Sequence, residues 1–337
     1  MADITVLGAG GFGVALSVML ERFAHRVTLW SAFSEEIEAI KRDGEHKKLL
    51  PGVPVPDSIQ LTDDISCVAG KELVIFAVPS FAVRQVAQKA VSYLDENTIA
   101  ANVAKGLERG TLKRLSQVLA EELPRNKVVV LSGPSHAEEV ARGIPTTIVC
   151  ASDDRESAQK VQDIIMNKTL RIYVNDDLIG VELGAALKNV IALAAGINDG
   201  LGLGDNSKAA LMTRGITEIA RLGCALGSQR ETFAGLSGIG DLIVTCTSMH
   251  SRNRRAGILI GEGNTAAQAI EKVGMTVEGY ISCKCAYDLS HKAGIEMPII
   301  DQMYEVLYND KKARDAIRDL MERPKRHESE MVWLLSR

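Results

Sequence analysis

A lysine in the middle of an apolar helical segment is the residue of this sequence best suited to proton transfer. Lys188 lies within ELGAALKNVIALAAGI, and the small residues Gly184, Ala185, Ala192 and Ala195 share its face of the expected helix. These neighbours let a ligand or another backbone come close, so the ammonium group should be desolvated. Desolvation lowers the pKa of lysine from about 10.4 toward neutrality, which suits a group that takes up and returns a proton. The competing interpretation is a side chain that extends to the surface and keeps its charge in water.

Polar groups farther along the chain could complete a site around this lysine. Asp241 follows the glycine-rich segment GLSGIG, which we interpret as a flexible loop, and could orient the lysine; Glu182 is the nearer carboxylate. Ser251, Arg252 and Asn253 combine a capping hydroxyl, a guanidinium fork and backbone N–H groups at a helix start, which can hold an anion. Two or three charge-assisted hydrogen bonds of roughly 1.5–3 kcal/mol each suffice for a phosphate-sized ligand. A solvated basic helix turn is the alternative.

A glycine-rich turn close to the N-terminus predicts a dinucleotide site. Gly8-Ala9-Gly10-Gly11-Phe12-Gly13 matches G-x-G-x-x-G, directly after an expected strand and at the start of a helix expected from about Phe12 to Phe23. Gly8 permits the tight turn, Gly10 lets the backbone approach a pyrophosphate, and Gly13 allows close packing of helix and strand. The helix N-terminus offers N–H groups to the anion.

The end of the second expected strand does not distinguish NAD from NADP. NAD sites often carry an acid about 20 residues beyond the glycine turn, whereas NADP sites have an arginine nearby. This chain has Trp30-Ser31-Ala32-Phe33 there. The nearest acids, Glu35 and Glu36, are expected to begin a solvated helix, so either cofactor remains possible.

Three loops that follow expected strands carry further polar groups. They are residues 78–80 (VPS), 102–106 (NVAKG) and 132–135 (SGPS). In a doubly wound sheet the ligand lies outside the carboxyl ends of the strands. Lys105, between a buried strand and a glycine, is therefore expected to contact a ligand rather than remain a solvated lysine. Ser135 is expected to cap a helix, a role compatible with ligand binding.

Strand and helix patterns divide the chain into two halves. The first half alternates short β-branched runs with helical patterns, as in a parallel sheet covered by helices. From about Asp176 the pattern is helical, broken by glycine-rich loops at 198–206 and 235–241. We predict an α/β protein: an N-terminal Rossmann-type, doubly wound, mostly parallel sheet (1–178) and a second, mainly α-helical domain (179–337). The expected strands are Ile4–Leu7, Val27–Trp30, Leu73–Val78, Thr98–Val103, Val128–Leu131, Thr147–Cys150 and Arg171–Val174.

Composition narrows the class of protein. The chain has 337 residues, 46% of them hydrophobic, and a formal net charge of -4, so a nucleic-acid partner is not expected. The N-terminus lacks the basic region of a signal peptide, and no apolar stretch is expected to reach the roughly 20 residues that span a bilayer. The cysteines lack zinc or redox spacing, which favours reduced thiols without a metal. These features predict a cytoplasmic protein without a membrane partner, and charged residues 322–330 should form a solvated helix or tail.

The motifs together resemble one family, the NAD(P)-dependent glycerol-3-phosphate dehydrogenases of the soluble bacterial type. The matching blocks run through nearly the whole chain: GAGGFG, FAVPS, NVAKG, LSGPSHAEEV, ELGAALKNVIALAAGI, GLSGIGDLIVTCTS and SRNRRAG. The resemblance implies hydride transfer between NAD or NADP and the pair dihydroxyacetone phosphate and sn-glycerol 3-phosphate, which supplies glycerophosphate for phospholipids. It also implies a homodimer.

The resemblance further implies roles for individual residues. Lys188 would accept and donate the proton, with Lys105 and Asp241 completing its electrostatic surroundings. The substrate pocket would comprise Lys105, Gly133, Ser135, Lys188, Asn189, Asp241, Thr245, Ser251, Arg252 and Asn253. Besides Gly8, Gly10 and Gly13, cofactor contacts would involve Gly11, Phe12, Lys105, Ala137, Arg252 and Glu278.

This chain departs from the family pattern at three places. Many relatives have serine at Gly11, arginine or histidine near residues 31–33, and tyrosine at Leu49. The second departure argues against a strong NADP preference, and the third removes a possible cofactor contact.

Two other function classes remain open at this point. One is a related two-domain dehydrogenase acting on a hydroxy acid or hydroxyacyl substrate, which would usually carry a His-Glu pair or a different lysine motif. The other is a dinucleotide-sensing regulator, which would not need Lys188, Asp241 and Arg252 together.

Overall fold

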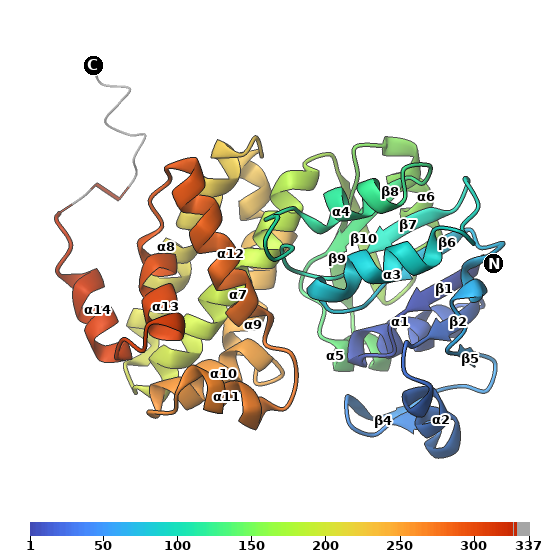
Figure 1. Cartoon of the computed structure of the whole chain (residues 1–337), viewed down its shortest axis with the longest axis horizontal. Helices are drawn as coiled ribbons and strands as arrows, with labels where there is room; N and C mark the ends of the chain where they lie inside the picture. Colours follow the sequence, from blue (N-terminus) through green and yellow to red (C-terminus); the bar gives the residue numbers. More distant parts are fainter. Residues whose placement is uncertain (326, 329–337) are drawn as a thin grey trace.

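The first half of the chain builds an eight-stranded sheet covered by helices, and the second half is helical (Figure 1). The structure, a computed structural model, describes residues 1–325 and 327–328. The sheet has the order β10-β9-β8-β7-β6-β1-β2-β5, and every neighbouring pair is parallel except β8 with β9. This confirms the predicted α/β, doubly wound and mostly parallel architecture. The strands are β1 Asp3–Leu7, β2 Arg26–Trp30, β5 Gln60–Thr62, β6 Leu73–Phe76, β7 Ile99–Asn102, β8 Val128–Ser132, β9 Thr146–Ala151 and β10 Leu170–Asn175.

Each predicted strand is present, and three short ones were not predicted. β3 Glu45–His46 pairs antiparallel with β4 Leu50–Pro54, whose sequence LPGVP contains two prolines and a glycine. β5 is only three residues long and lies at the sheet edge. Such compositions and lengths carry little strand signal. The remaining difference is β10, where Tyr173 is exposed because this strand forms the other edge.

Helices cover the sheet on both faces because alternate residues of each strand point to opposite sides. One apolar core joins Ile4, Val6 and Ile75 to α1 Gly11–Arg22, α5 Ala137–Arg142 and α6 Arg155–Ile165. The other joins Leu7, Val74 and Phe76 to α3 Val83–Ala90 and α4 Leu115–Glu122. Smaller elements of this half are α2 Ser34–Asp43, η1 Ile65–Val68 and η2 Ser80–Ala82.

The second half packs around one buried helix, α7 Leu178–Gly200 (Figure 1). Its 23 residues are long and apolar enough to cross a membrane, so the expectation that no stretch reaches that length was wrong. However, 94% of its apolar window is buried inside the protein, as in the core helix of a folded domain. The other elements of this half are α8 Gly204–Ala225, η3 Arg230–Ala234, η4 Leu236–Gly240, α9 Asp241–Thr247, α10 Arg252–Gly261, α11 Ala266–Val273, α12 Glu278–Ala293, α13 Pro298–Tyr308 and α14 Ala313–Met321.

Both glycine-rich loops expected in this half are largely helical. α7 continues to Gly200 and α8 begins at Gly204, so only residues 201–203 connect them. The GLSGIG segment forms the π-helical turn η4, which runs directly into α9. Part of the expected charged segment 322–330 lies outside the described residues; residues 322–325 and 327–328 are not helical.

Glycines set the closest helix contact, between α7 and α10. A Cβ on Gly257 would stand 2.0 Å from the carbonyl oxygen of Leu193, and one on Gly196 would stand 2.1 Å from that of Arg254. The two backbones can therefore touch only because both positions lack a side chain. This contact fixes the first turn of α10 beside α7.

Candidate active site

The carboxylate of Asp241 joins two lysines that come from different halves of the chain. Lys188 Nζ on α7 donates to Asp241 Oδ1, and it also donates to Thr245 Oγ1 at 2.6 Å. Lys105 Nζ, from the loop after β7, donates to Asp241 Oδ2 at 2.7 Å and to the carbonyl of Gly133 at 3.0 Å. Lys188 is only 4% exposed and Asp241 only 1%. The predicted site residues from four separate segments therefore meet in one buried cluster.

The electrostatics of this cluster prepare Lys188 for proton transfer. Burial lowers its pKa to about 8, with the attraction of Asp241 opposing that shift and the positive charge of Lys105 adding to it. Burial alone would raise the pKa of Asp241, but the two lysines hold it below its usual value. Asp241 thus stays ionised while Lys188 exchanges its proton near neutral pH.

The π-helical turn η4 positions Asp241. A Cβ on Gly238 would stand 2.1 Å from the carbonyl of Phe233, so this tight turn requires glycine there. A Cβ on Gly184 of α7 would lie 2.9 Å from the carbonyl of Ser237. The small residues predicted beside Lys188 therefore admit a backbone, and that backbone carries the partner carboxylate. The expected flexible loop before Asp241 is instead a packed turn, with Ser237 and Gly238 buried.

Glu182, the alternative partner for Lys188, is used elsewhere. Its Oε2 accepts from Arg114 Nη1 at 2.6 Å, and its Oε1 accepts from the backbone N–H of Ser116 at 2.8 Å. This buried carboxylate of α7 therefore stabilises the start of α4. It ties the helical half to the sheet half without reaching Lys188.

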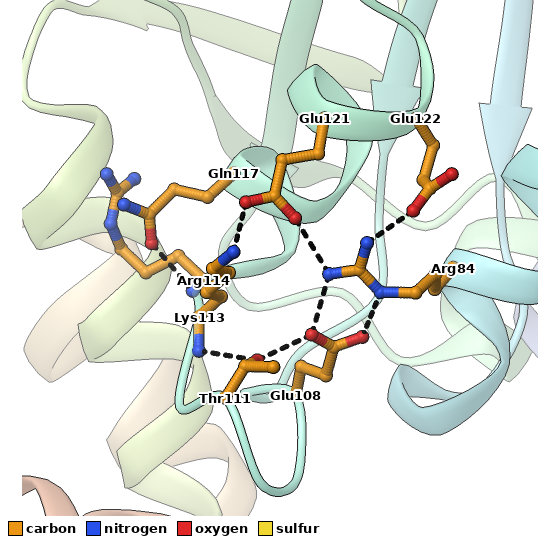
Figure 2. A network of polar contacts seen from close by, with 8 residues as sticks. All are labelled: Arg84, Glu108, Thr111, Lys113, Arg114, Gln117, Glu121 and Glu122. Atoms are coloured by element: carbon orange, nitrogen blue, oxygen red, sulfur yellow. Dashed lines mark hydrogen bonds and ion pairs between the residues drawn. The ribbon is translucent and has the colours of Figure 1, made fainter.

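A charged network holds the segment that follows Lys105 (Figure 2). The Arg84 guanidinium on α3 bonds Glu108 through Nε at 2.6 Å and Nη2 at 2.8 Å, and Nη2 also bonds Glu121 of α4 at 2.9 Å. Leu107 and Arg114 form a β-bridge at the base of the same segment. The bridge and the network therefore hold the chain at Leu107 and Glu108, two and three residues beyond Lys105.

Gly133 and Ser135 lie beside Lys105, as predicted. Gly133 has φ 142° and a Cβ there would come within 3.0 Å of Ile148, so only glycine suits this position. Its carbonyl accepts from both Lys105 and the Ser135 hydroxyl, the latter at 3.0 Å. Ser135 therefore does not cap α5; His136 stands at that position without a side-chain capping bond.

The predicted anion cradle at the start of α10 is only partly free. Ser251 caps the helix by accepting from the Arg254 N–H at 3.2 Å. Asn253 Nδ2 donates to Asn189 Oδ1 at 3.0 Å, and Asn253 Oδ1 accepts from the Gly279 N–H at 2.8 Å. These bonds hold α7, α10 and α12 together.

Two cations of this turn have no hydrogen bond or ion pair within residues 1–325 and 327–328: Arg255, whose Nε is buried, and Arg252. Burial lowers the pKa of Arg252, and the nearby carboxylate of Glu278 opposes that shift. A half-buried guanidinium without such a partner can bind an anion such as phosphate.

Glu278 connects the helical half to the loop after β6. Its Oε2 accepts from the Ser80 hydroxyl at 2.7 Å and its Oε1 from the Ser80 N–H at 3.1 Å. A Cβ on Gly106 would stand 2.7 Å from Ser80 Cβ, so the loop of Lys105 packs against the same serine. The VPS loop, residues 78–80, was predicted to lie near the ligand, but no role was predicted for Ser80.

The glycine turn has the geometry of a dinucleotide site. Gly8 has φ 119°, and a Cβ on Gly13 would stand 1.9 Å from the Gly8 carbonyl, so the turn and the close helix contact both require glycine. A Cβ on Gly10 would meet nothing within 4 Å, and Gly10 provides no side-chain cap to α1. Phe12, in the first turn of α1, packs partly buried against the core, and so does Ala137 at the start of α5. The space around Gly10, directly before the N-terminus of α1, is therefore open, and a helix N-terminus is a position where an anion can bind.

Glu35 and Glu36 lie in the first turn of α2, as expected, and Glu35 is exposed. The carboxylate of Glu36 is instead partly buried, accepts from the Ser31 hydroxyl, and lies 3.0 Å from His46 Nε2. The sequence did not predict these bonds because His46 belongs to the unpredicted hairpin β3–β4.

His136 is a second side chain near the lysines that had no predicted role. Its Nε2 is buried without a hydrogen-bond partner among the described residues. Burial lowers its pKa, and the charge of Lys188 lowers it further. Its position directly after Ser135 in SGPSHAE was the available signal.

A cavity of about 1000 Å³ lies apart from the lysines, between the end of β10 and η4. Tyr173, Asp176 and Leu236 are among the residues that line it, whereas Lys105, Lys188 and Asp241 are not. Within the described part of the chain no cluster of three His, Cys, Asp or Glu could hold a metal ion, and the six cysteines are free thiols.

A glycine turn of the dinucleotide-binding type on a doubly wound sheet, together with a buried lysine that can exchange a proton, defines an oxidoreductase of the Rossmann type. Comparison with known proteins identifies the family. Residues 3–158 match the N-terminal model of NAD-dependent glycerol-3-phosphate dehydrogenase, and residues 177–318 match its C-terminal model. The chain belongs to this family.

Individual relatives agree over nearly the full length. The chain is 56% identical to glycerol-3-phosphate dehydrogenase [NAD(P)+] of Moorella thermoacetica, covering 97% of this chain and 98% of the relative. The corresponding protein of Clostridium perfringens is 53% identical, with 97% and 99% covered. A crystal structure of glycerol-3-phosphate dehydrogenase from Coxiella burnetii is similar with a TM-score of 0.92 at 38% identity, covering 96% of this chain and 99% of that one.

Proposed function

We propose that this enzyme catalyses the reversible reduction of dihydroxyacetone phosphate to sn-glycerol 3-phosphate with NADH or NADPH. The observation that carries the proposal is the Lys188–Asp241–Lys105 cluster, in which a desolvated lysine with a pKa of about 8 is held by an ionised carboxylate. Membership of the glycerol-3-phosphate dehydrogenase family supplies the substrate pair.

In this proposal Lys188 exchanges the proton of the reaction. When the ketone is reduced, negative charge develops on its oxygen, and the Lys188 ammonium stabilises that charge and donates the proton. In the reverse direction neutral Lys188 accepts the hydroxyl proton. Asp241 and Thr245 fix the amine through the bonds they make with Nζ, and Lys105 adds positive charge. The nicotinamide, when bound, supplies or accepts the hydride.

Arg252 is proposed to bind the substrate phosphate, because its half-buried guanidinium has no hydrogen-bond or ion-pair partner among the described residues, a property that Arg255 of the same turn shares. Asn253 and Asn189 would hold that turn in place through their mutual hydrogen bond. The remaining pocket residues are proposed to be Lys105, Gly133, Ser135, Lys188, Asp241, Thr245 and Ser251.

The glycine turn is proposed to hold the pyrophosphate of the cofactor. Gly8, Gly10, Gly11, Phe12 and Gly13 form the turn and the start of α1, and the space around Gly10 is open. We propose further cofactor contacts from Lys105, Ala137, Arg252 and Glu278. Glu278 and Arg252 attract each other electrostatically, so the two could contact one ligand together.

Four features of the whole protein belong to the same proposal. We propose a division into a dinucleotide-binding domain, 1–178, and a substrate domain, 179–337, and a homodimer as the assembled form. We also propose a cytoplasmic location and a role in supplying glycerophosphate to phospholipid synthesis.

The proposal is tested by following the absorbance of NADH and of NADPH with dihydroxyacetone phosphate. The competing substrates are the ketones whose reduction would give a hydroxy acid or a hydroxyacyl compound. The proposal expects NADH or NADPH to be oxidised with dihydroxyacetone phosphate, and faster than with the competing ketones. Turnover of a competing ketone alone would favour the related dehydrogenase class, and no turnover with any would contradict an enzymatic role.

A further inference from the structure

The carboxyl end of β2 carries a hydrogen-bonded network that closes on the glycine turn. The Gly8 N–H donates to the Trp30 carbonyl at 2.8 Å, so Ser31, the next residue, begins directly beside the turn. The Ser31 hydroxyl donates to Glu36 and accepts from the Phe33 N–H at 3.2 Å. The first turn of α2 is thereby folded back toward the end of the strand.

His46 anchors the same carboxylate from the other side. Its Nδ1 accepts from the Leu49 N–H at 3.3 Å, so in the neutral ring the proton lies on Nε2, which donates to Glu36 Oε1 at 3.0 Å. The Leu49 carbonyl in turn lies 2.7 Å from where a Cβ on Gly11 would stand. Ser31, Glu36, His46 and Leu49, hereafter the β2-end network, therefore surround one side of the glycine turn. Serine at residue 11 would collide with it.

Glu36 keeps its negative charge within this network. The hydrogen bond from His46 lowers its pKa most, and the bond from Ser31 adds to the effect while partial burial opposes it. The charges of His46 and of the exposed Lys48 also lower the pKa of this carboxylate, and residues 31–33 include no arginine. A fixed carboxylate therefore lies beside Ser31, directly after the carboxyl end of β2, the strand end near which dinucleotide sites hold the adenosine ribose.

We propose that Glu36 makes this enzyme selective for NADH over NADPH. Its carboxylate can accept a hydrogen bond from a ribose hydroxyl, whereas it repels a 2′-phosphate at the same position. Since the network holds Glu36 by two bonds, the carboxylate cannot readily turn away from the phosphate. The proposal rests on the proposed function only in that the glycine turn binds a nicotinamide dinucleotide.

Equilibrium binding tests the proposal without turnover. Isothermal titration of the full chain with ADP-ribose and with 2′-phospho-ADP-ribose should give at least about tenfold weaker binding for the phosphorylated ligand, since close like charges cost more than 1.4 kcal/mol. Glu36→Gln should bring the dissociation constants of the two ligands closer together, because binding of 2′-phospho-ADP-ribose becomes stronger. The matched control is Glu35→Gln, which removes an exposed carboxylate from the same helix turn and should leave the ratio of the two dissociation constants unchanged.

Two further measurements distinguish the loss of charge in Glu36→Gln from misfolding of that variant. Ser31→Ala keeps the charge of Glu36 and removes only its hydrogen bond with Ser31, so this variant should still bind ADP-ribose more tightly than 2′-phospho-ADP-ribose. In steady-state kinetics, the ratio of kcat/KM for NADH to that for NADPH should fall in Glu36→Gln and not in Glu35→Gln. Equal binding of the two ligands by the wild type, or an unchanged ratio of their dissociation constants in Glu36→Gln, would overturn the proposal. Discrimination by binding without turnover of dihydroxyacetone phosphate would contradict the proposed reaction alone.

Discussion

At the scale of single residues, burial and the shared carboxylate of Asp241 act in opposite directions on the titration of Lys188. Burial lowers the pKa of Lys188 most, Asp241 opposes that shift, and the positive charge of Lys105 adds to it, so the pKa is about 8. Proton acceptance needs neutral Lys188 and proton donation needs the charged form. Rates in the two directions should therefore depend on pH with opposite sign.

We predict that kcat for glycerol 3-phosphate oxidation rises with pH through about 8, and that kcat for ketone reduction falls above it. Asp241→Asn removes the attraction, so Lys188 should lose its proton more readily and both profiles should move to lower pH. Lys105→Met removes the repulsion and should move them to higher pH. Initial rates across pH check this, and shifts in the same direction for both variants would contradict the electrostatic account.

Arg252 provides a second prediction at this scale. Arg252→Ala should raise the KM for dihydroxyacetone phosphate about tenfold to a hundredfold, the equivalent of one charge-assisted hydrogen-bond pair, with a smaller change in kcat. Arg252→Lys keeps the charge but cannot form two parallel hydrogen bonds to the phosphate, so its KM should lie between those of wild type and Arg252→Ala. Steady-state kinetics measure these KM values, and an unchanged KM in Arg252→Ala would show that this residue does not bind the phosphate.

At the scale of elements, the contact between α7 and α10 positions the first turn of α10, which holds the proposed phosphate-binding residue Arg252. Gly257→Ala should destabilise the protein by about 1–3 kcal/mol, because the added Cβ overlaps the Leu193 carbonyl and the helices must separate. Gly261→Ala, whose Cβ would lie 2.6 Å from the Ile197 carbonyl, should cost less. Urea unfolding measures both. Alanine raises intrinsic helix stability, so a gain in stability for Gly257→Ala would show that the helices are not in close contact.

The sequence predicted the strands and Lys188 well for the same physical reason. Buried strands and a lysine among small apolar residues are local patterns that tertiary contacts reinforce. Asp241 was recognised as a partner, but its supporting turn was not, because glycines that indicate a loop also permit the π-helical turn η4. Glu36 was missed because its partner His46 comes from a hairpin with almost no strand signal.

At the scale of the whole molecule, the site exists only because the sheet half and the helical half pack together (Figure 1). Lys105 with Asp241, Ser80 with Glu278, and Arg114 with Glu182 each join the two halves by hydrogen bonds. The sheet half supplies the glycine turn and Lys105, and the helical half supplies Lys188, its partner carboxylate Asp241, and Arg252. Patterns within one segment could not predict these pairings, since their partners are separated by 68 to 198 residues.

The central claim is that Lys188 exchanges the proton, and the most direct test is the kcat of Lys188→Ala for ketone reduction with and without added methylamine. The account predicts a loss of roughly 10²–10⁴-fold, the contribution typical of a positioned acid–base group, and partial recovery as the amine enters the space left by the side chain. Binding of ADP-ribose should be unchanged, which controls for folding. Undiminished kcat in Lys188→Ala would contradict the account.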